Sequence, residues 1–444
     1  MSPREKLALF GGQPTLKKPL AAYNSIGSEE ERAALRVMRA ARKRGEALSG
    51  FLGRGGEGFL GGAEVKKLEE NFRKRFKVKY AISFNSATTA LQAAVAALGA
   101  GPGDEIITSP FTMSATSAAV LLNGATPVFA DIDPDTYCLS AKTIQAKITR
   151  RTKAIIVVNL FGGTADYDPI LHFAKKRGIK IIEDNAQAAG AFYKERLAGT
   201  IGDAGVFSFN VHKVIQSGEG GMMVTNNKRY AYRAQLARNH GEAVEADAIR
   251  LNPKYVPELV LGSNYRLTEI QAAIVTEQLK KLDKLNTKRI ALADHLSKRL
   301  KDFNWLAPAY VLPRSRHVYY LYPLRFFSER AGISRATFAT ALAAEGFPLS
   351  EGYNTPLHFL PIYQHKRIFE RTQFPFVSSE FPQDVSYEIG SLPVAERMFG
   401  AELLMTTLCQ PPKSRRDVDL FVKAIQKIET NLSLLKEYER ERKV

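Results

Sequence analysis

The middle of the chain alternates between short apolar runs and longer amphipathic stretches. Seven apolar runs rich in β-branched residues predict strands, at 80–84 (YAISF), 105–110 (EIITSP), 125–132 (ATPVFADI), 153–162 (KAIIVVNLFG), 179–186 (IKIIEDNA), 206–209 (VFSF) and 221–227 (GMMVTNN). Helical or turn-forming segments, such as 63–75 and 88–98, separate them. Strands that alternate with helices and are apolar along their whole length indicate an α/β fold with a mostly parallel sheet between helices.

The pattern changes after the last of these strands. From Leu267 to Leu300 apolar residues recur at intervals of three and four, which predicts one long helix. A strand at 317–327, a helix at 334–346 and a last amphipathic helix near 418–435 follow. We therefore expect three parts, which are an N-terminal segment (1–30), a large α/β domain (31–290) and a smaller C-terminal α+β domain (291–444).

Composition narrows the class of protein. With 444 residues, 45% of them hydrophobic and 24% charged, the chain has the make-up of a soluble globular protein. No apolar run of about 20 residues predicts a membrane span, and the opening MSPREKLALFGGQP does not fit a signal peptide. Cys138 and Cys409 form no metal-binding spacing, so we expect no metal site and a reducing, cytoplasmic setting.

The charge balance is strongly basic. The 63 Lys and Arg residues against 45 Asp and Glu residues give a net charge of +18 and a pI near 9.7. Such a field attracts nucleic acid, an anionic membrane or a small anionic substrate. The basic residues are dispersed, and no zinc-finger spacing or RNA-binding signature accompanies them. A solvated surface is therefore favoured, and a nucleic-acid-binding protein is a minor alternative.

Polar residues follow several predicted strands, at the sheet edge where α/β folds bind ligands. The NSATTAL stretch after the first strand opens a helix, whose free N–H groups bind an anion or merely carry a Ser/Thr N-cap. Asp184 ends a buried strand, where it caps the next helix or pairs with a cationic ring nitrogen.

The segment FSFNVHKVIQSGEGG at 207–221 contains a lysine between a strand and a glycine-rich turn. A phosphate-binding P-loop needs its glycines before the lysine, and here they follow it. A sheltered lysine at a strand–turn junction can instead form a Schiff base with an aldehyde or ketone. Ser208 and the Gly218–Gly221 run suit a tight turn beneath a ligand, so Lys213 is the candidate for covalent chemistry.

Together these motifs resemble the DegT/StrS family of pyridoxal-phosphate-dependent sugar aminotransferases, which have the aspartate-aminotransferase-like fold type I. The resemblance extends from LALFGGQP to LPVAER near residue 397, and its ordered motifs are SFNSATTAL, SPFTMSAT, PVFADIDPDT, TKAIIVVNLFGGTADYD, IIEDNAQAAGA, GVFSFNVHKVIQSGEGG and GSNYRLTEIQAA. It implies pyridoxal phosphate as cofactor, pyridoxamine phosphate between the half-reactions, and a homodimer with active sites at its interface.

The resemblance also implies roles for individual residues. Lys213 would form the internal aldimine and then shuttle a proton between substrate and cofactor. Asp184 would pair with the pyridine nitrogen, and Gln187 would lie beside the ring's phenolic oxygen. The residues that would hold the phosphate are Ala87, Thr88, Ser208 and, reaching the site of the neighbouring subunit, Asn264 and Arg266.

Three positions depart from the family's pattern. Met113 stands where an aromatic ring usually stacks on the cofactor, although a thioether can also cover a ring. Ala87 replaces a common glycine, which is tolerable if its φ is negative. His212 precedes the lysine where threonine is frequent, and a structural role, a place at the cofactor edge and a catalytic role all stay open.

The implied reaction is a ping-pong transfer of nitrogen from glutamate or glutamine to a nucleotide-linked 3- or 4-keto sugar, which the positive charge favours as an anion. A keto-cyclitol of the scyllo-inosose type is the alternative acceptor. Related dehydratases carry histidine in the lysine position, but the register from Ser208 puts Lys213 there. Iron–sulfur relatives need cysteines to ligate a cluster, and the two distant cysteines of this chain cannot do that. A pyridoxal-phosphate-binding regulator without turnover is a further alternative.

Substrate contacts are the least specified by the sequence. Tyr353 and His358, in EGYNTPLHF, correspond to residues near the sugar in the family, although a core tyrosine and a surface histidine fit equally. Glu219 either orients the lysine or finishes the turn. The Gly50–Gly62 loop, with Arg54, would border the substrate entrance.

Overall fold

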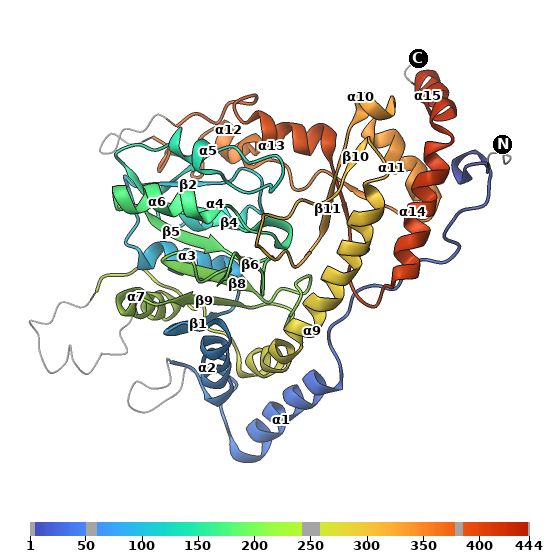
Figure 1. Cartoon of the computed structure of the whole chain (residues 1–444). Coiled ribbons are helices and arrows are strands. Elements are labelled where there is room, and N and C mark those ends of the chain that lie inside the picture. Colours follow the sequence, from blue (N-terminus) through green and yellow to red (C-terminus); the bar gives the residue numbers. More distant parts are fainter. Residues whose placement is uncertain (1–4, 50–59, 242–257, 378–384, 443–444) are drawn as a thin grey trace, which may run out of the picture.

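The computed structural model of the chain describes residues 5–49, 60–241, 258–377 and 385–442 (Figure 1). Its two main sheets lie in separate stretches of the sequence, and the long helix α9 (Glu269–Leu300) connects them. No helix within the described ranges is long and apolar enough to cross a membrane.

The larger sheet contains the seven strands that the sequence predicts. They are β1 (Tyr80–Phe84), β2 (Glu105–Thr108), β3 (Thr126–Phe129), β4 (Thr152–Val158), β5 (Lys180–Asp184), β8 (Ala204–Ser208) and β9 (Gly221–Thr225). Their spatial order is β1-β9-β8-β5-β4-β2-β3. Strand β9 runs antiparallel to both neighbours, and the other neighbouring pairs are parallel. The predicted mostly parallel sheet is therefore confirmed.

Both faces of this sheet are buried, which is why most positions of its strands are apolar. In β4, Ala154 and Ile156 pack under the helices of one face, while Ile155 and Val157 pack on the other. The helices around the sheet are α2 (Ala63–Phe76), α3 (Ala87–Ala97), α4 (Ala115–Leu121), α5 (Ala141–Gln145), α6 (Tyr167–Arg177) and α7 (Lys228–Arg238). A short hairpin of β6 (Phe192–Tyr193) and β7 (Arg196–Leu197) precedes β8.

The smaller sheet is antiparallel and has the order β10-β11-β13-β12. Its strands are β10 (Leu306–Ala307), β11 (Tyr322–Phe326), β12 (Ser350–Glu351) and β13 (Leu403–Thr406). The helices of this part are α10 (Ser328–Ala331), α11 (Arg335–Ala344), α12 (Pro361–Gln364), α13 (Pro393–Arg397), α14 (Arg415–Glu429) and α15 (Leu432–Glu441). The boundary expected at residue 290 falls inside α9, so one continuous helix belongs to both parts.

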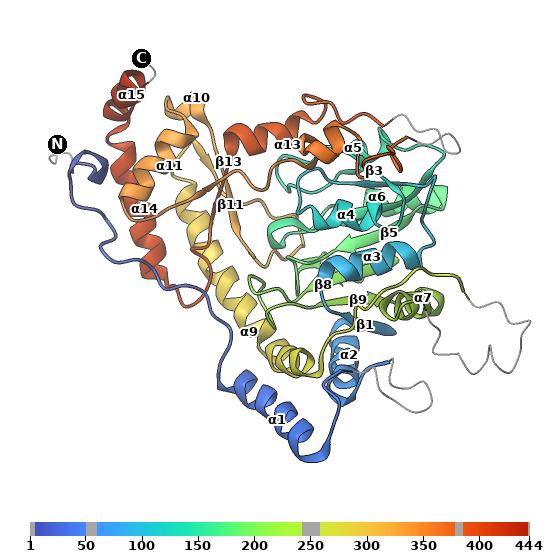
Figure 2. The ribbon, with the colours of Figure 1, turned by 180° about the vertical axis from the view of Figure 1, so that it is seen from behind.

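The last helix of the chain differs from the expected pattern. The amphipathic stretch 418–435 is split between α14 and α15. At the break, Asn431 donates its side-chain amide to the carbonyl of Lys427 (2.8 Å) and to that of Glu5 (3.2 Å). The N-terminal segment is largely ordered: it runs from the 3₁₀ turn Ala8–Phe10 along the smaller part to helix α1 (Ser28–Arg44), which packs on α9 (Figure 2).

Candidate active site

Asp184 is the last residue of β5, in the middle of the larger sheet, and only 6% of it is exposed. Its carboxylate accepts hydrogen bonds from the Thr116 hydroxyl (2.8 Å) and from the backbone N–H of Ala186 (3.2 Å). Burial raises the pKa of Asp184, while these two bonds and the charge of Lys213 act against the rise. Since a carboxylate can accept about four bonds, Asp184 retains the capacity for another donor.

A tight loop between β8 and β9 carries the lysine. The N–H of Phe209 donates to the carbonyl of Gly220 (2.9 Å), and the N–H of Val211 donates to that of Gly218 (2.8 Å). Both glycines have positive φ, +154° and +83°, which other residues rarely adopt. The glycine run after Lys213 therefore closes the loop, in agreement with the predicted tight turn.

The side chain of Lys213 is half-buried. Burial lowers its pKa, and the negative charges of Asp184 and Glu219 act in the opposite direction. The lysine Nζ lies 4.7 Å from the centre of the Tyr320 ring. An amine with a lowered pKa has a larger neutral fraction, and the neutral form is both the nucleophile and the base.

Two predicted residues in the same loop as Lys213, His212 and Glu219, make few contacts. His212 is exposed, and its backbone N–H donates to the side-chain oxygen of Asn210 (3.2 Å). Glu219 is also exposed and accepts a bond from the amide of the same Asn210 (2.8 Å). Asn210 therefore connects the two ends of the loop, and the roles of His212 and Glu219 stay predictions.

The beginning of α3 and the end of β8 come together. Ser208 lies opposite Gly221 in the β8–β9 register. The backbone of Gly221 is so close to α3 that an added Cβ would lie 2.4 Å from the Ser86 carbonyl oxygen and 2.6 Å from the Ala87 nitrogen. Ala87 is helical, so its φ is negative, as its place in the glycine position requires. A helix N-terminus beside a hydroxyl binds anions well, and Thr88 lies in its first turn.

Gln187 and Tyr353, which are far apart in the sequence, are joined by a hydrogen bond. The amide of Gln187 donates to the Tyr353 hydroxyl (2.8 Å), and its oxygen accepts from the backbone N–H of Phe161 (2.8 Å). The Tyr353 ring packs edge-on against Phe111 and Phe161, with centroids 5.7 and 5.2 Å apart. The Tyr353 ring is thus packed in the core, and its hydroxyl is hydrogen-bonded to Gln187, which is predicted to contact the cofactor.

His358 is fully buried, which makes the surface alternative for this residue wrong. Its Nε2 lies 2.9 Å from a carboxylate oxygen of Glu396, and burial lowers the pKa of the imidazole. Met113 has the opposite environment, because 55% of it is exposed and its sulfur accepts a contact from the amide of Asn354 (3.4 Å). Substrate contact by His358 and ring cover by Met113 stay predictions.

The segment predicted to reach a neighbouring subunit lies beside α3. The carbonyl of Asn264 accepts a bond from Asn85 (3.4 Å), just before α3, and its side chain is exposed. Arg266 is partly buried and donates to the side-chain oxygen of Asn239 (3.2 Å). Arg54 and residues 50–59 of the predicted entrance loop lie outside the described residues.

Two members of the cluster, Thr116 and Tyr320, carry no sequence signal that marks them as functional. Thr116 belongs to the quoted SPFTMSAT motif, and a hydroxyl in the first turn of a short helix looks like an ordinary capping residue. Tyr320 lies in the strand-like run HVYYLYPLRFF, but β11 begins only at Tyr322. Tyr320 therefore lies before the strand, and its ring lies against the amine of Lys213.

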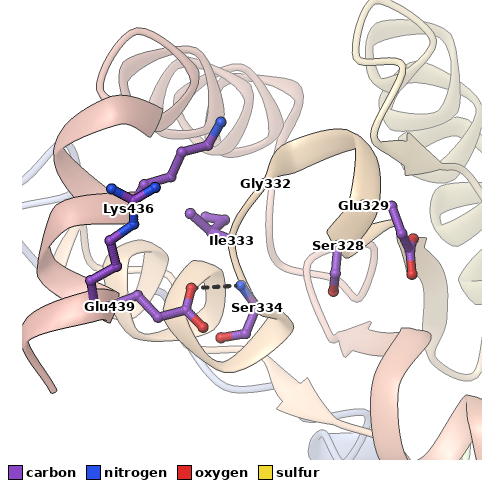
Figure 3. A pocket seen from close by; sticks show the side chains of 8 residues that line it. Ser328, Glu329, Gly332, Ile333, Ser334, Lys436 and Glu439 are labelled. Atoms are coloured by element: carbon purple, nitrogen blue, oxygen red, sulfur yellow. Dashed lines mark hydrogen bonds between the residues drawn. The ribbon is translucent and has the colours of Figure 1, made fainter. Parts of the chain in front are cut away.

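A separate pocket of about 460 Å³ lies on the smaller part of the molecule, between α10, α11 and α15 (Figure 3). Its lining includes Glu439, whose carboxylate accepts a bond from the backbone N–H of Ser334 (2.9 Å) and thereby caps α11. The pocket shares no residue with the cluster around Lys213, and its polar contact is explained by helix capping.

Comparisons with known proteins agree with this geometry. The model of the DegT/DnrJ/EryC1/StrS aminotransferase family matches residues 52–404. GDP-perosamine synthase of Caulobacter vibrioides is 37% identical over 305 residues, which are 68% of this chain and 80% of that protein. The putative L-glutamine:3-amino-2,3-dideoxy-scyllo-inosose aminotransferase of Micromonospora echinospora is 32% identical over 441 residues, 97% of this chain and 99% of that protein.

The fold is likewise that of known aminotransferases. The X-ray structure of the aminotransferase from Psychrobacter cryohalolentis superimposes with a TM-score of 0.77 at 28% identity, covering 94% of this chain and all of that one. Pyridoxal phosphate is the cofactor of this family. The cluster fits it chemically, with a carboxylate for the ring nitrogen, an amine for the aldehyde and a helix N-terminus for the phosphate. The chain is therefore an aminotransferase of the DegT/DnrJ/EryC1/StrS family.

Proposed function

We propose that this enzyme transfers an amino group from glutamate or glutamine to a nucleotide-linked 3- or 4-keto sugar. The observation that carries the proposal is the pair of Asp184 and Lys213 after neighbouring strands, one group with a raised pKa and the other with a lowered one. The net charge of +18 supports an acceptor with a diphosphate. The name of the Caulobacter relative, GDP-perosamine synthase, also points to a nucleotide-linked amino sugar.

In this proposal each residue has a distinct task. Bound pyridoxal phosphate supplies a ring that withdraws electrons from the carbon bearing the amino group. Asp184 would keep a proton on the ring nitrogen, since its carboxylate is buried and accepts few other bonds. Lys213 Nζ would move a proton between the substrate carbon and the cofactor in each half-reaction, away from the donor carbon in the first and onto the acceptor carbon in the second. Gln187 would contact the ring oxygen, and Tyr353 accepts a hydrogen bond that holds the amide of Gln187 in place.

A direct experiment follows from the task of Lys213. The purified protein should bind pyridoxal phosphate with yellow absorbance, and borohydride should fix the cofactor on the peptide that contains Lys213. Incubation with ¹⁵N-labelled glutamate or glutamine and a panel of keto-sugar nucleotides should then yield one labelled amino sugar. A protein that binds no cofactor, or fixes it on another lysine, would contradict the proposal. Cofactor binding without transfer to any acceptor would favour a regulator.

A keto-cyclitol is the second candidate acceptor. The match to the Micromonospora protein covers 97% of this chain, including N-terminal and C-terminal residues beyond the 52–404 that the family model matches. In that protein's name the acceptor is a scyllo-inosose derivative and the donor is L-glutamine. The same labelled-donor experiment therefore includes keto-cyclitols. Transfer to these and not to keto-sugar nucleotides would decide for the second candidate.

We further propose that the active unit is a homodimer in a reducing compartment such as the cytoplasm. Two leucines just before Asn264 support the dimer, because Leu259 is 80% exposed and Leu261 is 91% exposed, which suits a covered interface. The thiols of Cys138 and Cys409 are free and buried, which suits a reducing environment.

Mixed dimers test the shared site. Subunits with Lys213→Ala and subunits with Arg266→Ala should each be nearly inactive alone. After subunit exchange, about a quarter of wild-type activity should return, because half of the dimers are mixed and each mixed dimer has one complete site. Proven mixed dimers without any recovered activity would place Arg266 in its own subunit's site.

A further inference from the structure

Tyr320 lies against the lysine of the active site. The Lys213 Nζ is 4.7 Å from the centre of its ring, within the range in which an ammonium group is attracted to an aromatic face. The ring is only partly buried. It also lies close enough to Tyr353 for the charge on one phenol to affect the other. Tyr320 thus lies against Lys213 and near Tyr353, and both Lys213 and Tyr353 are influenced by the charge of Asp184.

The backbone of Tyr320 is held by contacts that a simple wall residue does not need. Its carbonyl accepts bonds from Gln410 (2.8 Å) and from Arg289 (3.3 Å). The preceding residue, Tyr319, has a φ of +50°, a strained value for an aromatic residue. Gly162 packs directly beneath, since an added Cβ would lie 2.8 Å from the nitrogens of both tyrosines. Strain that neighbouring contacts maintain is typical of functional positions.

Arg289 contacts the backbone of Tyr320 directly and is linked to the lysine loop through Tyr23. It bonds the tyrosine backbone on one side, and on the other its guanidinium lies 4.5 Å from the ring centre of Tyr23. The Tyr23 hydroxyl in turn donates to the carbonyl of Val214, the residue after the lysine. Burial lowers the pKa of Arg289, so a cation is kept here at a cost in stability. One guanidinium thus fixes the spacing between the lysine loop and the Tyr320 ring.

We propose that Tyr320 is a further catalytic residue, whose ring face holds the ammonium form of Lys213 in the active site whenever the lysine is not covalently engaged. The inference rests on the proposed role of Lys213. An aromatic face attracts a cation by the electrons of its ring and leaves a neutral amine nearly unaffected. Tyr320 therefore stabilises the protonated lysine without adding a further negative charge. Another negative charge would stabilise the ammonium group so strongly that the lysine would not release its proton.

The charged groups that face Lys213 also raise its pKa, and they belong to other elements of the fold. Asp184 approaches from β5 and Glu219 from the glycine turn, and both raise the pKa of the lysine against the effect of burial. Tyr353 is protonated at neutral pH, because burial raises the pKa of its hydroxyl. Removal of the Tyr320 face should therefore leave the lysine with two carboxylates and lower its pKa by a limited amount.

The experiment measures Lys213 in the cofactor-free protein. Formaldehyde with cyanoborohydride methylates only neutral amines, so the methylation rate of the Lys213 peptide across a range of pH gives the pKa of the lysine. We expect Tyr320→Leu to lower this pKa by about half a unit to one unit, which speeds methylation about three- to tenfold below the pKa. Tyr320→Phe keeps the ring face and should match wild type. Tyr310→Leu, at a half-exposed tyrosine, is the control.

Each other outcome is informative. An unchanged or raised lysine pKa in Tyr320→Leu overturns the inference, and an equal shift in Tyr320→Phe overturns it by assigning the effect to the hydroxyl. If the leucine variant does not fold, Tyr320→Met, with an unbranched side chain, gives the same comparison. Failure of the proposed function is distinct, since it appears as wild-type protein that does not bind pyridoxal phosphate through Lys213.

Discussion

Two pairs of a lysine and a buried carboxylate in this molecule have opposite arrangements. In the smaller part, Lys427 lies 2.9 Å from a carboxylate oxygen of Glu345, and both side chains are almost fully buried. In the larger part, Lys213 and Asp184 influence each other's charge without a direct ion pair in the structure. In the first pair the two charged groups bond to each other. In the second pair the amine and the carboxylate can each still bond to a ligand.

The bonds around each carboxylate explain the difference. Glu345 accepts from the backbone N–H of Ala8 (2.8 Å), from the N–H and hydroxyl of Thr15 (2.9 and 2.7 Å) and from Lys427. Burial would raise the pKa of Glu345, but these bonds outweigh it and hold the pKa below its usual value. For Asp184 burial prevails and the pKa is raised. A saturated carboxylate anchors the N-terminal segment, and an unsaturated one can serve a ligand.

The largest effect is expected from removing the lysine of the unsaturated pair. Lys213→Ala should lower the rate of amino transfer by about 10⁴-fold, because the proposed base and covalent attachment are both lost. The melting temperature of the cofactor-free protein should not fall, since no ion pair is broken. Single-turnover assays and calorimetry measure the two quantities. Transfer near the wild-type rate would remove Lys213 from the mechanism.

Removing the lysine of the other pair, Lys427, should lower the stability of the protein and leave the rate of transfer nearly unchanged. Lys427→Met leaves Glu345 buried without its cation and should lower the free energy of unfolding by about 3–5 kcal/mol. The rate of transfer per folded molecule should stay within about twofold of wild type. Urea unfolding of Lys427→Met together with Glu345→Leu is the control, because removing both charges should restore part of the stability. A double variant less stable than the single one would contradict this account.

The sequence predicts the two pairs unequally. The strands around Asp184 and Lys213 are local apolar runs, and the ordered motifs that contain both residues identify them without a structure. Glu345 and Lys427 lie 82 residues apart and belong to no motif, so their contact depends on how α11 and α14 pack. Tertiary packing also brings Thr116 and Tyr320 into the site. Sequence patterns therefore predict residues at strand ends, while contacts between distant elements require coordinates.

A smaller change should convert the unsaturated carboxylate into a poorer partner for the cofactor. Thr116→Val removes the hydroxyl that donates to Asp184, and this bond is the largest influence that opposes the rise in the pKa of Asp184. The carboxyl should then ionise less readily, and the dissociation constant for pyridoxal phosphate should rise about tenfold. Absorbance titration measures it. Thr116→Ser retains the hydroxyl and should bind as wild type does; equal loss in both variants would show a packing effect instead.

The smallest expected effect is a change in the free energy of unfolding that has opposite signs for Asp184 and Glu345. Asp184 has a raised pKa in the folded protein. The protein therefore loses stability as pH rises from the unfolded pKa of this group to its folded pKa. Glu345 has a lowered pKa, so it contributes stability above its unfolded pKa that is lost as pH falls through the folded one. In cofactor-free protein at neutral pH, Asp184→Asn should therefore be more stable than wild type by about 1 kcal/mol, while Glu345→Gln is less stable.

Urea unfolding over a range of pH tests both signs in one series. The gain from Asp184→Asn should decline as pH falls below the folded pKa of Asp184 and should be gone below its unfolded pKa. The loss from Glu345→Gln should vanish as pH falls through the lowered folded pKa of Glu345. Added pyridoxal phosphate should reverse the order for Asp184 alone, because the ring nitrogen then gives the wild-type carboxylate the partner that it lacks in the free protein. Destabilisation by Asp184→Asn without cofactor would mean that Asp184, like Glu345, is already satisfied by the fold.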